Sequence, residues 1–409
     1  MDKKKQSLKE IFAEALEYYR IKNFKTAEIF CYKILSIDSN HFDSVCLLAN
    51  INAISRNFNK AKEFLERAIK IQPENVSILN NLGTSYKELG KSEEAINFYQ
   101  KVLGIDPNHT NANYNLGLIF YELKELKRAK EYLEKTVKIQ PNYAFAHYSL
   151  GNLQKELKEL KRAKESYLKA IKIRPSFASA QNNLGLVFSN IGDPDSAMKC
   201  YNKALEIDPK HAGAYNNLGR LYTETGELEK AIESHKVAIK LEPQNLVHTY
   251  YLSELDKNFL NSEVKNKTEE ILNNKETYRI NLVYGNFLLS RYERNEKNYE
   301  KEFNYLIKAH KNYFELKKKK FESGIKYCFN DVLQISKFAK LKNANNNNKI
   351  KPIFIIGVPR CGSTLIEKII GSGKESIPMG EEVIALEHLI NTKVHEKKSL
   401  NLGEAGSFR

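Results

Sequence analysis

One 34-residue unit recurs seven times between Leu8 and Asn245, and this period restricts the possible fold more than any other feature of the sequence. Alanine stands at one position of every copy: Ala27, Ala61, Ala95, Ala129, Ala163, Ala197 and Ala231. Glycine and proline keep the same step at two further positions: Gly83, Gly117, Gly151, Gly185 and Gly219, and Pro73, Pro107, Pro141, Pro175, Pro209 and Pro243. A fixed period of this length predicts an array of structural units, each packed against the next.

The residue types at these positions predict two antiparallel helices in each unit. Glycine and alanine let helices cross closely, and proline ends the second helix because it removes a backbone donor and disfavours helix in the residue before it. The third unit shows the pattern as Leu82, Gly83, Tyr86, Ala95, Tyr99 and Pro107. This pattern resembles the tetratricopeptide repeat (TPR) family, which implies an α-solenoid wound into a right-handed superhelix over 8–245. Ala15 and Ala49 replace the glycine in the first two units, as a looser capping end would tolerate.

Composition and cysteine usage predict a soluble, cytoplasmic protein. No apolar run in the 409 residues approaches the roughly 18 that a membrane helix requires, and charges follow Met1 where a signal peptide would be apolar. The five cysteines show no paired spacing, which is typical of reduced thiols: Cys31, Cys46, Cys200, Cys328 and Cys361. The cysteines and the scattered histidines predict no metal site.

The formal net charge of +15 suits a polyanionic cofactor better than a nucleic acid. Lysines alternate with glutamates along the repeats, as in residues 124–128, and no nucleic-acid recognition motif occurs. We therefore expect neither a nucleic acid nor a membrane as a partner.

The strict period fades after Pro243, although apolar residues keep a helical spacing from Tyr284 to Ile307. We expect a helical extension over 246–342 with a degenerate TPR and a capping helix. The asparagine-rich stretch 343–351 has no apolar period and is predicted to be a linker between two domains.

Residues 352–409 begin like an α/β domain. The apolar run 353–356 predicts a buried strand, and the glycine-containing loop 357–364 leads into a helix with Leu365 on its apolar side. A strand, a glycine loop and a helix N-terminus form a cradle for phosphate-like anions. The spacing approaches that of a nucleotide P-loop, but the lysine of that motif is missing and Arg360 is the cation.

The segment Val358-Pro359-Arg360-Cys361-Gly362-Ser363-Thr364-Leu365 resembles the 5′-phosphosulfate-binding loop of sulfotransferases, particularly the protein-tyrosine sulfotransferases, with Cys361 in place of serine. Gly380-Glu381-Glu382 follows at that family's spacing. The resemblance implies transfer of a sulfuryl group from 3′-phosphoadenosine 5′-phosphosulfate (PAPS) to a tyrosine-like or sugar hydroxyl. It also implies that Arg360, Cys361, Gly362, Ser363 and Thr364 bind PAPS, that Arg360 stabilises developing charge, and that Glu382 is the general base.

Other interpretations of these residues stay open. Arg360 could pair with Glu381 or Glu375, and Glu382 could be a carboxylate favoured by the start of a helix. In sulfotransferases the 3′-phosphate site and most of the parallel sheet lie downstream of the position of Arg409, so we expect the domain to be incomplete and inactive in this chain alone.

Two functions follow from these patterns. One is a PAPS-dependent sulfotransferase whose TPR solenoid recruits a protein or peptide substrate. The other is a TPR interaction scaffold with an inactive sulfotransferase remnant. A nucleotide-dependent kinase is less favoured because the loop lysine is missing.

A column of asparagines within the repeats is the candidate peptide site. It consists of Asn81, Asn115, Asn183 and Asn217 and is interrupted by Ser149. An amide offers one donor and one acceptor group, which matches a peptide bond, and the column resembles the asparagine ladder in the TPR region of O-linked N-acetylglucosamine transferases. We expect these side chains on the concave face. The alternative is that they form hydrogen bonds within the helices.

Overall fold

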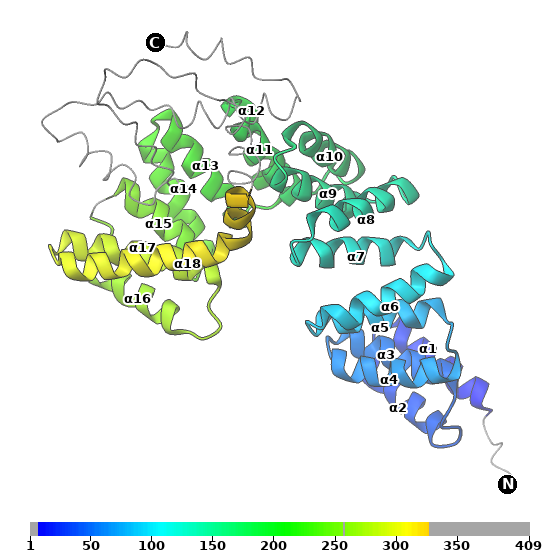
Figure 1. Ribbon diagram of the computed structural model, residues 1–409. Helices are drawn as coiled ribbons and strands as arrows, with labels where there is room; N and C mark the ends of the chain where they lie inside the picture. The colour runs from blue at the N-terminus through cyan, green and yellow to red at the C-terminus, as the bar shows by residue number, and fades with distance from the viewer. Residues whose placement is uncertain (1–6, 257, 327–409) are drawn as a thin grey trace, which may run out of the picture. The chain divides into compact units, whose positions relative to one another are not determined.

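The computed structural model describes residues 7–256 and 258–326, with side chains up to residue 318. Every regular element in these ranges is an α-helix (Figure 1). The chain divides into two compact units between Thr277 and Tyr278. The expectation of a mostly helical fold is confirmed for the described part, whereas the predicted linker 343–351 and the α/β segment 352–409 lie outside it.

Fourteen helices of the first unit form seven pairs that follow the 34-residue period. The pairs are α1 (Leu8–Arg20) with α2 (Phe24–Leu35), α3 (Phe42–Ile54) with α4 (Phe58–Ile71), α5 (Val76–Glu88) with α6 (Ser92–Ile105), α7 (Thr110–Glu122) with α8 (Leu126–Ile139), α9 (Ala144–Glu156) with α10 (Leu160–Ile173), α11 (Ala178–Asn190) with α12 (Pro194–Ile207), and α13 (Ala212–Thr225) with α14 (Leu228–Leu241). The second helix of each pair also packs against the first helix of the next. Each unit therefore contacts its sequence neighbours, as a repeat array requires.

The same tight turn joins the two helices of every pair. One residue of each turn has a left-handed φ between 57° and 84°: Lys22, Arg56, Gly90, Lys124, Lys158, Gly192 and Gly226. The next residue donates its backbone N–H to the carbonyl five residues earlier, as Glu125 does to Phe120 at 2.8 Å. Glycine adopts this backbone conformation freely, whereas lysine and arginine do so at a cost of about 1–2 kcal/mol.

The repeated prolines end the second helices, as predicted. The helix stops two residues before the proline in each case, so that α8 ends at Ile139 before Pro141 and α10 ends at Ile173 before Pro175. Proline in the chain just beyond a helix prevents its continuation and sets the position of the next turn.

The repeated glycines and alanines lie at close helix crossings, which confirms that prediction. All seven alanines of the column are fully buried. A Cβ atom added to Gly83, Gly151 or Gly185 would lie 2.8, 2.7 or 2.5 Å from the ring of the tyrosine that covers it. These tyrosines are Tyr99, Tyr167 and Tyr201, while Leu133 and His235 take the same position over Gly117 and Gly219.

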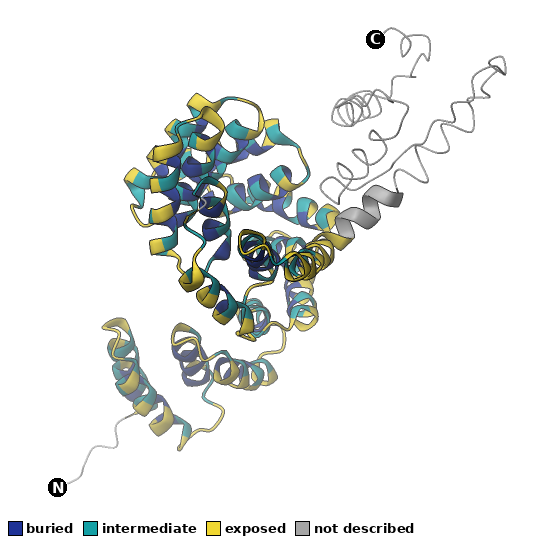
Figure 2. Cartoon of the chain, turned by 90° about the vertical axis from the view of Figure 1, so that its left-hand side faces the viewer, coloured by how far each residue is buried: buried dark blue, intermediate teal, exposed yellow. Residues whose placement is uncertain are grey.

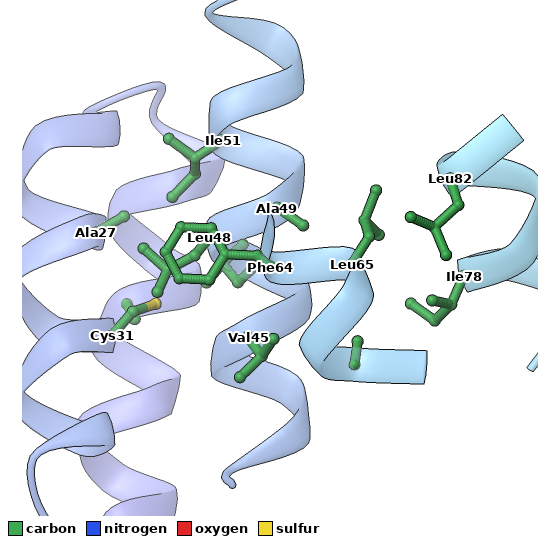
Figure 3. Packing of buried hydrophobic residues seen from close by; sticks show 13 residues of the cluster. Ala27, Cys31, Val45, Leu48, Ala49, Ile51, Phe64, Leu65, Ile78 and Leu82 are labelled. Atoms are coloured by element: carbon green, nitrogen blue, oxygen red, sulfur yellow. The ribbon is translucent and has the colours of Figure 1, made fainter. Parts of the chain in front are cut away.

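The first two pairs share one apolar core. Figure 3 shows Cys31 of α2, Leu48 of α3 and Phe64 of α4 filling the space between them. The alanines that replace glycine here, Ala15 and Ala49, are also buried. Figure 2 shows the general result: buried residues lie on the helix sides that face other helices, and exposed residues lie on the outward sides.

The last helices of the described part leave the strict period. The first unit ends with α15 (Leu246–Leu255) and α16 (Ser262–Asn273), and the second unit contains α17 (Arg279–Asn295) and α18 (Tyr299–Lys326). Lys297, between α17 and α18, has φ 59°, and Asn298 donates its N–H to the Glu293 carbonyl at 2.8 Å. This is the turn of the seven repeat pairs, and it occurs in the segment 246–342 where we expect a degenerate repeat. No helix within residues 7–256 and 258–326 has the length and apolarity to cross a membrane.

Candidate functional site

The structure describes one of the two groups of candidate site residues. The asparagine column lies on four first helices of the pairs, α5, α7, α11 and α13. The proposed PAPS-binding and catalytic residues, Arg360, Cys361, Gly362, Ser363, Thr364 and Glu382, lie outside the described residues. Within the described residues, the candidate site is therefore the one on the repeats.

The first helices of the pairs form a continuous layer. Successive members of the series α5, α7, α9, α11 and α13 contact one another, although the chain passes through a second helix between each two. The column residues are half-buried where these helices meet. We call this surface, defined by Asn81, Asn115, Ser149, Asn183 and Asn217, the asparagine face.

Hydrogen bonds connect most of the asparagine face across the boundaries between units. Asn115 Oδ1 accepts a hydrogen bond from Lys87 Nζ at 3.1 Å. Asn217 Nδ2 donates to Asn182 Oδ1 at 2.8 Å, and Asn81 Oδ1 accepts a long 3.5 Å bond from Asn80 in the same helix. The amides of Asn115 and Asn217 thus bond to side chains of the preceding unit, which differs from the alternative of bonding within one helix.

At three of these positions only one of the two polar groups of the amide, either its oxygen or its NH2 group, forms a hydrogen bond. Within the described part of the chain, Asn81 and Asn115 use their oxygen and Asn217 uses its nitrogen. The remaining polar group of each amide is not among the buried unsatisfied atoms, so it is accessible. An accessible polar group of the amide in each of three units can still donate to or accept from a polypeptide backbone.

The centre of the asparagine face is a denser network. Asn183 Nδ2 lies 3.2 Å from Tyr148 Oη and 2.8 Å from Asn152 Oδ1, and Tyr167 Oη donates to the same Asn152 oxygen at 2.7 Å. Burial raises the pKa of the Tyr167 phenol, which keeps it a neutral donor. Asn183 is therefore held in one orientation by its neighbours, and its role is to fix the geometry of the face.

Charged groups lie one turn beyond this network on the first helices. Burial lowers the pKa of Lys155, while Glu156 acts in the opposite direction. Glu156 also accepts a 2.9 Å hydrogen bond from Lys124 Nζ and, together with burial, raises the pKa of Tyr121. The Glu156 carboxylate therefore pairs with Lys124 and also acts electrostatically on Lys155.

Sequence reasoning missed a second column that supports the first. It precedes the asparagine face by one residue and consists of Asn80, Tyr114, Tyr148, Asn182 and Asn216. Tyr114 Oη lies 3.2 Å from Ser149 Oγ. The second column therefore contacts the asparagine face also at Ser149, where the asparagine is missing. The recurrence of asparagine at the same 34-residue step was the signal that could have identified it.

The cysteine thiols in the described part of the chain are not activated as nucleophiles. Its three cysteines are free, and burial raises the pKa of Cys31 to about 12 and that of Cys46 and Cys200 to about 11. Thiols with such pKa values are poor nucleophiles at neutral pH. The described residues contain no group of three or more histidine, cysteine or carboxylate side chains that could hold a metal ion.

Comparison with known families agrees with the repeat geometry. The tetratricopeptide repeat models match residues 110–143 and 176–242, and a further TPR model matches 83–124 and 155–192. The chain is a tetratricopeptide-repeat protein. Residues 21–102 also match the model of subunit 3 of the anaphase-promoting complex, or cyclosome.

Relatives and solved structures are similar to parts of this TPR protein. A curated UDP-N-acetylglucosamine–peptide N-acetylglucosaminyltransferase of Caenorhabditis elegans is 30% identical over 90 residues, which are 22% of this chain and 8% of that relative. A crystal structure of a tetratricopeptide repeat protein from Parabacteroides merdae is 20% identical, with a TM-score of 0.50 over 63% of this chain and all of that one. The crystal structure of MamA is 30% identical, with a TM-score of 0.37 over 40% of this chain and 95% of MamA. The likeness to the Parabacteroides structure shows the fold alone.

Proposed function

We propose that this protein is an interaction scaffold that binds an extended polypeptide along the asparagine face. One observation carries the proposal. At Asn81, Asn115 and Asn217, one polar group of the side-chain amide forms a hydrogen bond to a neighbouring residue, and the other polar group is accessible. A backbone segment needs donors and acceptors at regular intervals, and the repeat period supplies them. Placement of this face on the concave side of a right-handed superhelix is part of the proposal.

The curated relative supports this proposal for the matched segment. Its name describes an enzyme that modifies a peptide, and the likeness to this chain is 30% over 90 residues. The remainder of that relative, including what it transfers, has no counterpart in the match.

A paired set of double variants tests the asparagine face. Asn115→Ala combined with Asn217→Ala should weaken binding of a degenerate peptide pool by roughly 10- to 30-fold, because each lost hydrogen bond contributes about 1 kcal/mol. Binding is measured by fluorescence anisotropy with labelled pools. The control is Asn97→Ala with Asn202→Ala, which removes two exposed asparagines from the second helices α6 and α12. Equal losses in the two doubles, or no peptide binding by the unmodified protein, would reject the proposal.

Sulfuryl transfer from PAPS is a second candidate function, favoured by two sequence motifs at the spacing of sulfotransferases. These are the loop around Arg360 and the Gly380-Glu381-Glu382 segment. In a chain that carries the whole domain, Arg360→Ala should weaken PAPS binding by about 2–4 kcal/mol, measured by calorimetry, because a charge-assisted contact is lost. Glu382→Gln should leave PAPS affinity unchanged and lower turnover. Unchanged affinity in Arg360→Ala would remove Arg360 from the PAPS site.

We also propose that the protein acts in the cytoplasm. Three unpaired cysteines in the described part support a reducing compartment, where structural disulfides are rare. Mass spectrometry of alkylated protein from cells tests this proposal, which requires Cys31, Cys46 and Cys200 to be recovered as free thiols.

A further inference from the structure

An aromatic cluster borders the asparagine face where Ser149 interrupts the column. The ring centroids of Tyr143 and Phe145 lie 6.4 Å apart, and those of Phe145 and Phe177 lie 5.3 Å apart. The Arg174 guanidinium lies 5.3 Å from the centroid of Phe145 and 5.4 Å from that of Phe177. Phe145 remains 43% exposed and Arg174 is exposed. We call Tyr143, Phe145, Arg174 and Phe177 the aromatic patch.

The aromatic patch replaces residues that stabilise helices elsewhere in the array. At the position before the first helix, four units have a histidine or asparagine whose side chain accepts a hydrogen bond from the helix, and Asn245 does the same before α15; the four are His41, Asn75, His109 and His211. Tyr143 and Phe177 stand at this position before α9 and α11, and neither makes a capping bond. A lost N-cap costs about 1 kcal/mol. Two adjacent units therefore forgo this stabilisation where the aromatic patch lies.

Charge changes at the same place. The position of Arg174 is acidic or uncharged in the other six units: Asp38, Gln72, Asp106, Gln140, Asp208 and Glu242. Within the described part of the chain, Arg174 forms no ion pair, whereas Arg128 on α8 and Arg162 at the start of α10 pair with glutamates. The aromatic patch thus presents the Arg174 guanidinium, which has no carboxylate partner among the described residues, beside the exposed ring of Phe145.

The aromatic patch is continuous with the asparagine face. Tyr148 lies 4.8 Å from Phe177 between ring centroids, and its hydroxyl lies 3.2 Å from Asn183 Nδ2. Tyr143 lies 5.0 Å from Tyr114, whose hydroxyl is bonded to Ser149. A polypeptide on the asparagine face would therefore pass directly beside the aromatic patch.

We propose that the aromatic patch selects an acidic side chain next to a bulky apolar side chain in the polypeptide bound on the asparagine face. This inference rests on the proposed function and adds its sequence preference. A carboxylate pairs with the unpaired Arg174, whose guanidinium is kept in place by the rings. The neighbouring apolar side chain covers the exposed surface of Phe145, which adds hydrophobic and aromatic contact. A basic side chain at the same place is disfavoured by Arg174.

The test uses short degenerate peptide pools that differ only in a fixed central pair: Asp-Phe, Lys-Phe or Asp-Ser. Fluorescence anisotropy measures their binding to the unmodified protein and to three variants. Arg174→Gln and Phe145→Ser introduce the residues present at these positions in neighbouring units, Gln140 and Ser179, so the fold should tolerate them. Lys172→Gln is the control, because it removes one exposed charge from the same helix, α10.

We expect the unmodified protein and Lys172→Gln to bind the Asp-Phe pool about tenfold more tightly than either other pool. Arg174→Gln should remove the preference over Lys-Phe, and Phe145→Ser should remove the preference over Asp-Ser. Binding of all three pools with equal affinity would overturn this inference and leave the asparagine face intact as a binding surface. Loss of the preference in Lys172→Gln would also overturn it. Failure of every pool to bind would overturn the proposed function as well.

Discussion

Replacement of Tyr167 by alanine should lower the free energy of unfolding by about 3–5 kcal/mol, the range for removing a large buried aromatic side chain. Tyr167 is fully buried, its ring covers Gly151, and its hydroxyl donates to Asn152 at 2.7 Å. Alanine would leave a cavity between α9 and α10 and remove one of the two hydrogen bonds that Asn152 Oδ1 accepts, the other being from Asn183. Urea unfolding followed by circular dichroism measures the loss.

Tyr167→Leu is the matched control. Leu133 fills the same position over Gly117 in the preceding unit, so leucine is compatible with this crossing. We expect a loss of about 1–2 kcal/mol, mainly from the hydrogen bond and incomplete filling. Equal losses for alanine and leucine would show that the hydroxyl, and not ring packing over glycine, stabilises the unit.

Acidification from pH 6.5 to about 4 should remove roughly 3 kcal/mol of stability through His235. Burial lowers the pKa of this imidazole to about 4, and the charges of His248 and Arg220 act in the same direction. Over this range the unfolded chain binds a proton that the folded chain does not. The stabilisation is therefore complete above pH 6.5 and is lost as the pH falls toward 4.

The comparison with His235→Leu isolates this effect, since leucine occupies the equivalent position at Leu133 and does not titrate. Urea unfolding at a series of pH values should give a shallower decline between pH 6.5 and 4 for this variant. His147, whose pKa is also lowered by burial and which does not act on His235, retains its contribution in both proteins. Parallel stability profiles would exclude His235 as a source of acid sensitivity.

Much of the helical architecture could be predicted because the residues that recur every 34 positions determine where helices end and where they cross. Proline position located the helix ends, and glycine and alanine located the crossings, since each follows from backbone or steric rules within one unit. The turns were less visible. Gly90, Gly192 and Gly226 indicate a left-handed residue, but Lys124 and Lys158 adopt the same conformation because the hydrogen bonds around the turn enforce it.

The candidate site was predictable in position and not in its contacts. The asparagine column is visible in the sequence as a 34-residue step. Its hydrogen bonds, however, depend on which side chains of the neighbouring unit lie next to it, as Asn182 lies next to Asn217. This pairing arises from the packing of helices that are separated in the chain. The aromatic patch was not predicted, because Tyr143 and Phe177 are unremarkable singly and gain meaning only beside Arg174. The predicted PAPS site and the division of 246–409 stay predictions.

The break in the asparagine column at Ser149 has a consequence for how a long ligand is positioned. A surface built from identical repeats presents the same groups in every unit. A bound polypeptide could then shift by one unit along the array with nearly the same binding energy. Ser149 and Phe145 on α9, with Arg174 beside them, make one step unlike the others. For a polypeptide bound on the asparagine face as proposed, that difference would make one offset lower in energy than the others. Substitutions there should therefore alter where along the solenoid a ligand sits, even when the total contact it makes is unchanged.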